Sequence, residues 1–301
     1  MRICLMIEGQ EGVTWPQWVA LARACEDSGL EGLFRSDHYT GFHGGEGGSL
    51  DAWATLAALA ATTKRIRLGS LVSPATFRHP SLLARMVVTA DHAAGGGRIE
   101  LGMGAGWHED EHVRHGFPFP PRAERLAIFA EQLEIVRRSW TEDEFDFAGA
   151  HYELRGCRAL PKPLGTPNLI VGGSAKRGTV EPAVRFADEY NTIFATPEEC
   201  RQRRAAVDEA AERAGRAALR FSLMTPALVG ADRGEVEARR RRLGDLFPDG
   251  PHAIVGTVDE VVERLHEYEE AGVDRVMLQH LDHADVEAVE LLGREVAPHL
   301  V

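Results

Sequence analysis

The chain contains 301 residues, with 46 acidic and 34 basic side chains and a formal net charge of −12 at pH 7. Such an acidic surface repels nucleic acids and anionic membranes, so we expect neither as a partner and expect a small-molecule substrate instead. No apolar run approaches the ~20 residues that span a bilayer. The apolar run that follows Met1, residues 3–7, is too short for a secretory signal.

The four cysteines are widely spaced and form no C-x-x-C pair: Cys4, Cys25, Cys157 and Cys200. A chain of this length buries a sizeable core without needing cross-links. We therefore predict reduced thiols and a cytoplasmic location.

Apolar runs of strand length alternate with segments of helical periodicity along the chain. Strands are predicted at 3–7, 31–36, 66–72, 99–103, 168–172, 189–194, 219–229 and 273–279. Helices are predicted at 15–28, 50–61, 79–94, 122–139, 176–187, 198–214, 233–243 and 258–271. This alternation implies parallel strands joined by right-handed crossovers, and eight such units close a barrel. We predict an α/β fold, a single (β/α)8 TIM barrel over residues 1–301, with an open doubly wound sheet as the alternative.

Two segments depart from the alternation. Residues 141–167, between the fourth helix and the fifth strand, form an insertion that is too long for a routine connection. Excursions of this length usually serve as a lid or an oligomer contact, although a mobile loop is the simpler interpretation. Residues 246–257 are predicted to be irregular.

The second predicted strand ends in Ser36-Asp37-His38-Tyr39. Active sites of α/β barrels are built at the carboxyl ends of the strands, which makes these residues candidates. His38 is the natural proton donor or acceptor near neutral pH, and Asp37 is placed to orient it or to bind the polar edge of a ring. The alternative is a helix cap beside a surface histidine.

The third and fourth strands end in small residues. Ser70 and Leu71 lie near the end of the third strand, and Gly104, Gly106 and Trp107 follow the fourth. Small residues allow a flat ring to approach the backbone, although barrel packing demands them equally often. The glycines do not form a dinucleotide fingerprint, because no helix is predicted immediately after them.

A loop rich in histidine and acid follows, with His108, Glu109, His112 and His115. His108 and Glu109 are either polar site residues or solvated loop residues. The spacing fits no structural zinc motif, so we expect no metal site.

The fifth predicted strand runs into Gly172, Gly173, Ser174 and Lys176 at the start of a helix. Free backbone N–H groups, a hydroxyl and a cation at such a position together hold a phosphate of a nucleotide-like cofactor. A plain helix start with a solvated lysine is the alternative.

Five segments, in this order, resemble the luciferase-like flavin and deazaflavin oxidoreductases, and the resemblance spans nearly the whole chain. They read SDHY, LGSLVSPATFRHP, GGGRIELGMGAGWHEDEH, PFPPRAERL and LIVGGSAKRGT. Residues 95–125 are the most specific part, because a glycine turn, a strand, AGW, an acidic run and a Pro-Pro-Arg helix start follow one another there. The resemblance implies a TIM barrel, and relatives commonly form homodimers.

The resemblance also implies site roles. Asp37 and His38 match the Asp-His pair of deazaflavin-dependent members, in which these residues approach the central ring and the histidine is linked to proton transfer, so coenzyme F420 is favoured over FMN. Family members often carry a non-proline cis peptide behind the ring, and the matching bond here is Ser70–Leu71. Gly104, Gly106 and Trp107 match the cofactor wall. The matching phosphate-binding residues are Gly172, Gly173 and Ser174, beside Lys176.

Three functions follow as hypotheses. The leading one is F420-dependent hydride transfer between the deazaflavin C5 and a small organic substrate, with His38 moving the proton. The second is an FMN-dependent monooxygenase. The third is a barrel that binds a cofactor without turnover. The substrate and the direction of transfer are not encoded in any recognisable motif.

Overall fold

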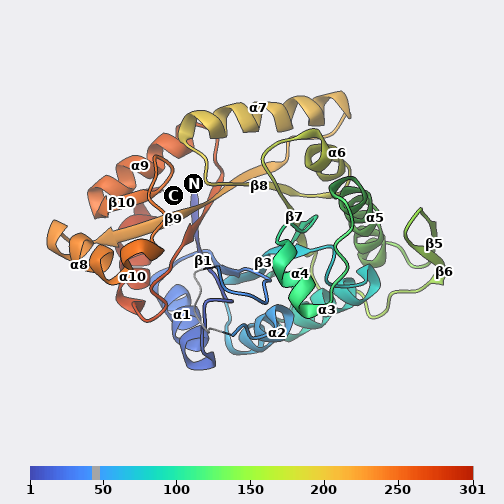
Figure 1. Ribbon diagram of the computed structural model, residues 1–301, viewed down its shortest axis with the longest axis horizontal. Helices are drawn as coiled ribbons and strands as arrows, with labels where there is room; N and C mark the ends of the chain where they lie inside the picture. The colour runs from blue at the N-terminus through green and yellow to red at the C-terminus, as the bar shows by residue number, and fades with distance from the viewer. Residues whose placement is uncertain (43–47, 301) are drawn as a thin grey trace.

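The computed structural model describes residues 1–42 and 48–300, and its centre is a closed barrel of eight parallel strands (Figure 1). The order around the barrel is β1, β2, β3, β4, β7, β8, β9 and β11, and β11 pairs with β1 to close the ring. The strand bounds are β1 Arg2–Ile7, β2 Gly32–Arg35, β3 Arg67–Pro74, β4 Ile99–Gly104, β7 Asn168–Gly172, β8 Glu189–Ile193, β9 Arg220–Gly230 and β11 Arg275–Gln279. Each barrel strand overlaps a predicted one. The TIM barrel is therefore confirmed, and the open sheet is wrong.

Helices surround the barrel and cover its outer face (Figure 1). Eight of them overlap the predicted helices: α1 Trp15–Ser28, α2 Ala52–Thr62, α3 Pro80–Ala93, α5 Arg122–Thr141, α6 Arg177–Phe186, α7 Pro197–Arg213, α8 Arg233–Leu243 and α9 Val258–Glu270. Local chemistry explains several starts. Thr14 and Gln17 form a capping box before α1, as Thr196 and Glu199 do before α7. None of the helices in the described part of the chain is long and apolar enough to cross a membrane.

Several short elements were not predicted. The insertion folds into an antiparallel hairpin, β5 Phe145–Ala148 and β6 Glu153–Cys157, which lies outside the ring of helices beside α5 (Figure 1). The segment predicted to be irregular ends in β10 Ile254–Thr257, which pairs with the end of β9. Helices α4 Glu109–His115 and α10 Val286–Leu291 are also additional. All of these are too short to show a clear period in sequence.

The amino-terminal end of the barrel interior is closed by buried charges. Arg275 donates to Glu100 Oε2 at 2.6 Å and to Glu189 Oε2 at 2.7 Å, and Arg67 pairs with the other Glu100 oxygen. Burial raises the pKa of Glu100, but Arg275 and Arg67 outweigh burial and hold that pKa at about 2. Burial raises the pKa of Glu189 above its usual value, because Arg275 lowers it less than burial raises it. One arginine therefore holds two buried acids together across the barrel.

The end of β3 is irregular, at the place where we expected a cis peptide. Ser70 pairs with Leu101 of β4 and Ser73 pairs with Met103, so the register shifts between them. The non-proline cis bond lies at Leu71–Val72, one residue beyond the predicted Ser70–Leu71 bond. The prediction was wrong by one residue because Ser70 is still part of the regular ladder.

Candidate active site

A cavity of about 480 Å³ opens at the carboxyl ends of the barrel strands, and most of its surface is apolar. Its walls have two different characters. One wall follows the ends of β3, β4 and β7 and contains Leu71, Val72, Gly104, Gly106, Gly172 and Gly173; we call it the glycine wall. The opposite wall follows β1, β8, β9 and β11 and contains Glu8, Asn191, Ile193, Met224 and Gln279; we call it the amide wall. Apolar cavities with a few polar groups are typical sites for cofactors and substrates.

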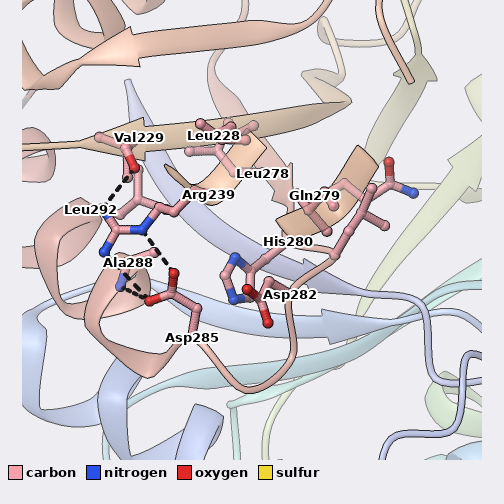
Figure 2. A pocket seen from close by; sticks show the side chains of 13 residues that line it. Leu228, Val229, Arg239, Leu278, Gln279, His280, Asp282, Asp285, Ala288 and Leu292 are labelled. Carbon is pink, nitrogen blue, oxygen red and sulfur yellow. Dashed lines mark hydrogen bonds and ion pairs between the residues drawn. The ribbon is translucent and has the colours of Figure 1, made fainter. Parts of the chain in front are cut away.

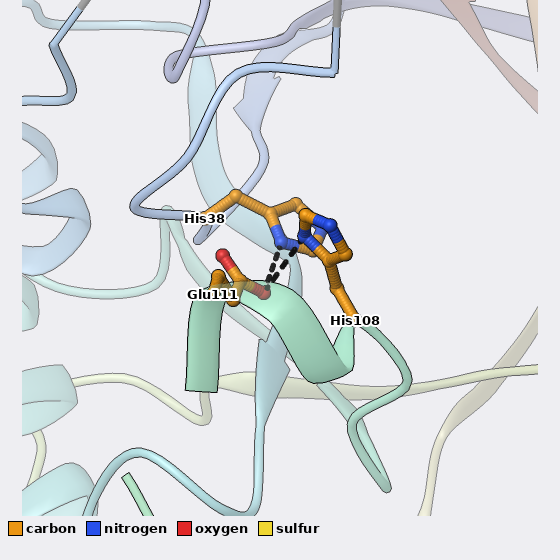
Figure 3. A group of neighbouring side chains, drawn as sticks. All are labelled: His38, His108 and Glu111. Atoms are coloured by element: carbon orange, nitrogen blue, oxygen red, sulfur yellow. Dashed lines mark hydrogen bonds and ion pairs between the residues drawn. The ribbon is translucent and has the colours of Figure 1, made fainter. Parts of the chain in front are cut away.

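His38 lines this cavity and is held by Glu111 of α4 (Figure 3). Its Nδ1 lies 2.7 Å from Glu111 Oε1, and the backbone N–H of Tyr39 donates to Glu111 Oε2 at 3.0 Å. Because the carboxylate accepts from Nδ1–H, Nε2 is the ring nitrogen left to exchange a proton with a ligand. The dyad therefore fixes both the ring position and the tautomer of the candidate catalytic histidine.

The charge of Glu111 decides the protonation of His38. Burial lowers the pKa of His38, but the hydrogen bond and the charge of Glu111 outweigh burial, and the pKa is raised above its usual value. The partner shifts the opposite way: burial raises the pKa of Glu111, but the bonds from His38 and Tyr39 lower it further. The pair is suited to keeping a proton on the imidazole near neutral pH.

His108 completes the group drawn in Figure 3. Its Nδ1 is 3.8 Å from Glu111 Oε1 and is buried without a hydrogen-bond partner, and its ring stacks on Trp107 at 5.1 Å between centroids. One ligand atom each from His38, His108 and Glu111 lies within 4.8 Å of the others, a spacing that could hold a metal ion. We expected no metal here, and the bond between His38 and Glu111 already accounts for two of the three groups.

Asp37 does not line the cavity. Its carboxylate accepts from Ser73 Oγ at 2.7 Å and from both terminal nitrogens of Arg78, at 2.5 and 3.1 Å. The side chain is almost completely buried. The structure therefore places Asp37 beneath the site, where it ties the end of β2 to β3 and so supports the neighbouring His38.

The predicted residues of β3 and the end of β4 also divide into those that line the cavity and those that do not. Ser70 is buried and donates to Gly102 O, whereas Leu71, Gly104, Gly106 and Trp107 line the cavity. Gly104 and Gly172 make room for Val72: a Cβ on Gly104 would lie 2.8 Å from Val72 Cγ2, and one on Gly172 would lie 3.1 Å from Val72 Cγ1. The surface that a ligand meets is therefore the valine side chain, backed by glycine.

This packing makes Gly104→Ala a direct test of the glycine wall. The new methyl group would push Val72 toward the cavity, so we expect cofactor affinity to fall by about tenfold or more, since overpacking costs about 1–3 kcal/mol. Titration of the variant with cofactor measures the change. Gly48→Ala is the control, because a Cβ there meets no atom of the described residues within 4 Å and Gly48 does not line the cavity. Equal affinities in the two variants would show that Val72 does not limit the site.

The turn after β7 reaches the cavity only in part. Gly172 and Gly173 line it, whereas Ser174 and Lys176 are exposed just beyond, before α6. The N–H groups of Gly173 and Ala175 are already bonded, to Asn191 O and Tyr190 Oη. An anion at this turn would therefore rely on Ser174, Lys176 and the first N–H groups of α6.

Sequence reasoning missed the residues that lie deepest in the site. Glu111 belongs to the segment predicted as an acidic, histidine-rich loop, although three acids before three basic residues and Gly116 form the charge pattern of a short helix. Glu8 follows β1, Asn191 lies within β8 and Gln279 ends β11, and none of the three belongs to a recognisable motif. The sequence also predicts that the Gly-rich loop from Gly41 to Ser49 shapes the substrate side, and positions 43–47 of this loop lie outside the described residues.

Comparisons with known proteins identify the family of this chain. The family described as luciferase-like monooxygenase matches residues 3–249. An F420-dependent glucose-6-phosphate dehydrogenase of Amycolatopsis mediterranei is 32% identical over 146 residues, which cover 48% of this chain and 44% of that protein. The pyrimidine monooxygenase RutA of Variovorax paradoxus is 29% identical over 204 residues, covering 64% of this chain and 52% of that protein. These matches span about half the length of the relatives.

Solved structures match over the whole chain at low identity. An F420-dependent secondary alcohol dehydrogenase in complex with an F420-acetone adduct has a TM-score of 0.84 at 20% identity and covers 100% of this chain and 99% of that one. The oxygenating constituent of 3,6-diketocamphane monooxygenase from Pseudomonas putida, in complex with FMN, has a TM-score of 0.77 at 19% identity, with the same coverage. At these identities the structures establish the shared fold, and the family match over residues 3–249 establishes that the chain belongs to the luciferase-like monooxygenase family, which has both F420-dependent and FMN-dependent members.

Proposed function

We propose that the protein is an F420-dependent oxidoreductase that transfers a hydride between the deazaflavin and a small organic substrate. The observation that carries the proposal is the His38–Glu111 dyad at the cavity, because hydride transfer to or from an oxygen-bearing carbon requires a proton to move as well. The F420-dependent relative supports the choice of cofactor.

The residues that line the cavity fit the flat tricyclic ring of a deazaflavin. The glycine wall exposes backbone and the Val72 side chain, and the cavity volume of about 480 Å³ accommodates a tricyclic ring together with a small substrate. Ser174 and Lys176 lie at the rim beside Gly173, where they are placed to hold a phosphate of the cofactor tail.

When bound, the cofactor supplies the hydride acceptor or donor. His38 Nε2 gives a proton to the substrate oxygen during reduction and removes it during oxidation, so one proton accompanies each hydride. Glu111 keeps Nδ1 protonated, holds the ring in place and stabilises the imidazolium that forms during oxidation. Trp107 and Phe42 contact the imidazole edge and separate it from solvent at the mouth of the cavity.

The test is a titration of the purified protein with F420 and with FMN, each oxidised and reduced, followed by cofactor fluorescence and absorbance. We expect F420 to bind at least about tenfold more tightly than FMN, which corresponds to about 1.4 kcal/mol. Tighter binding of FMN would overturn the proposal. Binding of F420 without reduction by any of a panel of alcohols would favour the barrel without turnover.

An FMN-dependent monooxygenase is the second candidate, and the pyrimidine monooxygenase relative favours it. The same apolar cavity would then exclude water from reduced flavin. Oxygen consumption on addition of substrate to the FMN-loaded protein distinguishes this function from hydride transfer.

A further inference from the structure

The amide wall contains polar groups that the proposed proton transfer does not use. Glu8 lies just after β1, Gln279 ends β11 and Asn191 lies in β8, and all three line the cavity among apolar neighbours. Their side chains are each more than nine-tenths buried. Buried amides and carboxylates normally have all their polar atoms bonded, so any atom left over points to a ligand.

Glu8 fixes the orientation of the Gln279 amide. Gln279 Nε2 donates to Glu8 Oε1 at 2.7 Å, and Gln10 Nε2 donates to Glu8 Oε2 at 2.9 Å. Gln10 is fixed in turn, because its Oε1 accepts from Ser36 Oγ. A carboxylate accepts only, so the nitrogen of Gln279 must face Glu8 and its oxygen must face away. That oxygen, Gln279 Oε1, is buried and has no partner among the described residues.

Gln279 lines both this cavity and a smaller one, which it shares with His280 (Figure 2). The Gln279 side chain extends away from the ion pair between Arg239 and Asp285, whereas the ring of His280 lies close to this pair. The cavity around His280 has a volume of about 20 Å³, which is room for about one water. The larger cavity is therefore the one that can supply a ligand to Gln279.

Asn191 repeats the pattern on the neighbouring part of the wall. Its Nδ2 donates to Ser222 Oγ at 2.9 Å and lies 3.7 Å from Met277 Sδ. Its Oδ1 is buried, and nothing in residues 1–42 and 48–300 bonds to it. The amide wall thus offers two buried acceptors, Gln279 Oε1 and Asn191 Oδ1. A buried acceptor is destabilising while it stays unbonded, so a ligand that brings an O–H or N–H group is favoured.

The cavity has no unpaired cation among the lining residues that the structure describes. Glu8 and Glu111 line it, and none of these lining residues is lysine or arginine. His38 is paired with Glu111, and Arg78 with Asp37 and Asp51. An anionic substrate would therefore face the Glu8 carboxylate in a largely apolar space with no free cation to offset it.

We infer that the amide wall binds an uncharged, mainly apolar substrate whose hydroxyl or N–H group donates to Gln279 Oε1 or Asn191 Oδ1, and that it rejects carboxylates and phosphates. The inference rests on the proposed function, because that function assigns the glycine wall to the cofactor ring and so leaves the amide wall to the substrate. It narrows the substrate class to neutral alcohols, hydroxylated ketones and amides.

The test compares three probes of one shape: 4-phenylcyclohexanol, 4-phenylcyclohexanone and 4-phenylcyclohexanecarboxylate. Dissociation constants are measured by ligand-observed NMR on the full chain, alone and saturated with whichever cofactor it binds. We expect the alcohol to bind at least about tenfold more tightly than the carboxylate. Because binding is measured without turnover, a failure of F420-dependent hydride transfer would leave this result intact and distinguishable.

Two variants separate the contribution of the Gln279 acceptor from that of the Glu8 charge. Gln279→Met removes the acceptor at similar volume, so it should weaken the alcohol by about fivefold and leave the ketone, which has no donor, unchanged. Glu8→Gln removes a charge, so it should tighten the carboxylate relative to the alcohol by about tenfold. The inference is overturned if the carboxylate and the alcohol bind the wild-type protein with equal affinity. It is also overturned if neither of them binds. An equal loss of alcohol and ketone in Gln279→Met also overturns it.

Discussion

Replacing Glu111 with glutamine is expected to lower kcat by about 10²–10⁴-fold, the range that a positioned acid–base group contributes. A glutamine amide that donates to Nδ1 would force the proton of neutral His38 onto Nε2, the wrong tautomer for accepting a proton there. Loss of the carboxylate also removes the group that raises the pKa of His38 against the effect of burial. The pKa of His38 should therefore fall.

The fall in pKa gives a measurement that does not depend on turnover. Titration of the His38 ring by NMR should show a lower pKa in Glu111→Gln than in wild type. The limb of the pH–rate profile that reports His38 should move to lower pH, whichever direction the reaction runs. Glu109→Gln is the matched control, because this neighbouring acid is exposed in α4. An unchanged pKa of His38 in Glu111→Gln would remove the positioning role.

Replacing Arg275 with methionine is expected to destabilise the fold by about 3–5 kcal/mol near neutral pH, because it leaves Glu100 and Glu189 buried without their shared cation. This is a large part of the stability of an ordinary domain. Urea denaturation gives the loss. Arg220→Met is the control, since Arg220 lies 3.4 Å from the same Glu189 but is 46% exposed, and it should cost less than about 1 kcal/mol.

The loss of folding stability in Arg275→Met should also depend on pH. In wild type the pKa of Glu100 is about 2, below its unfolded value, so this acid stabilises the fold above the unfolded pKa and loses that effect as pH falls toward 2. Without Arg275, the pKa of Glu100 would rise toward the unfolded value, and burial would raise the pKa of Glu189 further above it. The variant would then lose stability as pH rises, so the difference from wild type should be greater at pH 8 than at pH 5. A difference that is constant with pH would contradict the ionic account.

The sequence predicted the architecture closely because a barrel is made of repeated units. Each apolar run long enough to cross the core was recognisable as a strand, and each amphipathic segment between runs as a helix. The short elements, α4 among them, were missed because one or two turns of helix show no period. Since Glu111 lies on α4, the partner of the predicted histidine was missed with it.

Of the predicted site, His38, Leu71, Gly104, Gly106, Trp107, Gly172 and Gly173 line the cavity, whereas Asp37, Ser70, Ser174 and Lys176 do not. Adjacent residues leave a strand end in different directions, so a motif cannot say which of its members faces the cavity. Asp37 and His38 are the clearest case: one faces Arg78 beneath the site and the other faces the ligand space.

The sequence by itself therefore determined the barrel, the end of the barrel at which the cavity opens, and a histidine that lines the cavity, because periodicity and strand ends are local properties of the chain. Only the tertiary structure decided what that histidine contacts and what the opposite wall offers. Glu8 and Gln279 are 271 positions apart, and Glu111 is 73 positions from His38. Hydrogen bonds across such separations depend on how distant strands and helices pack, which no local pattern records.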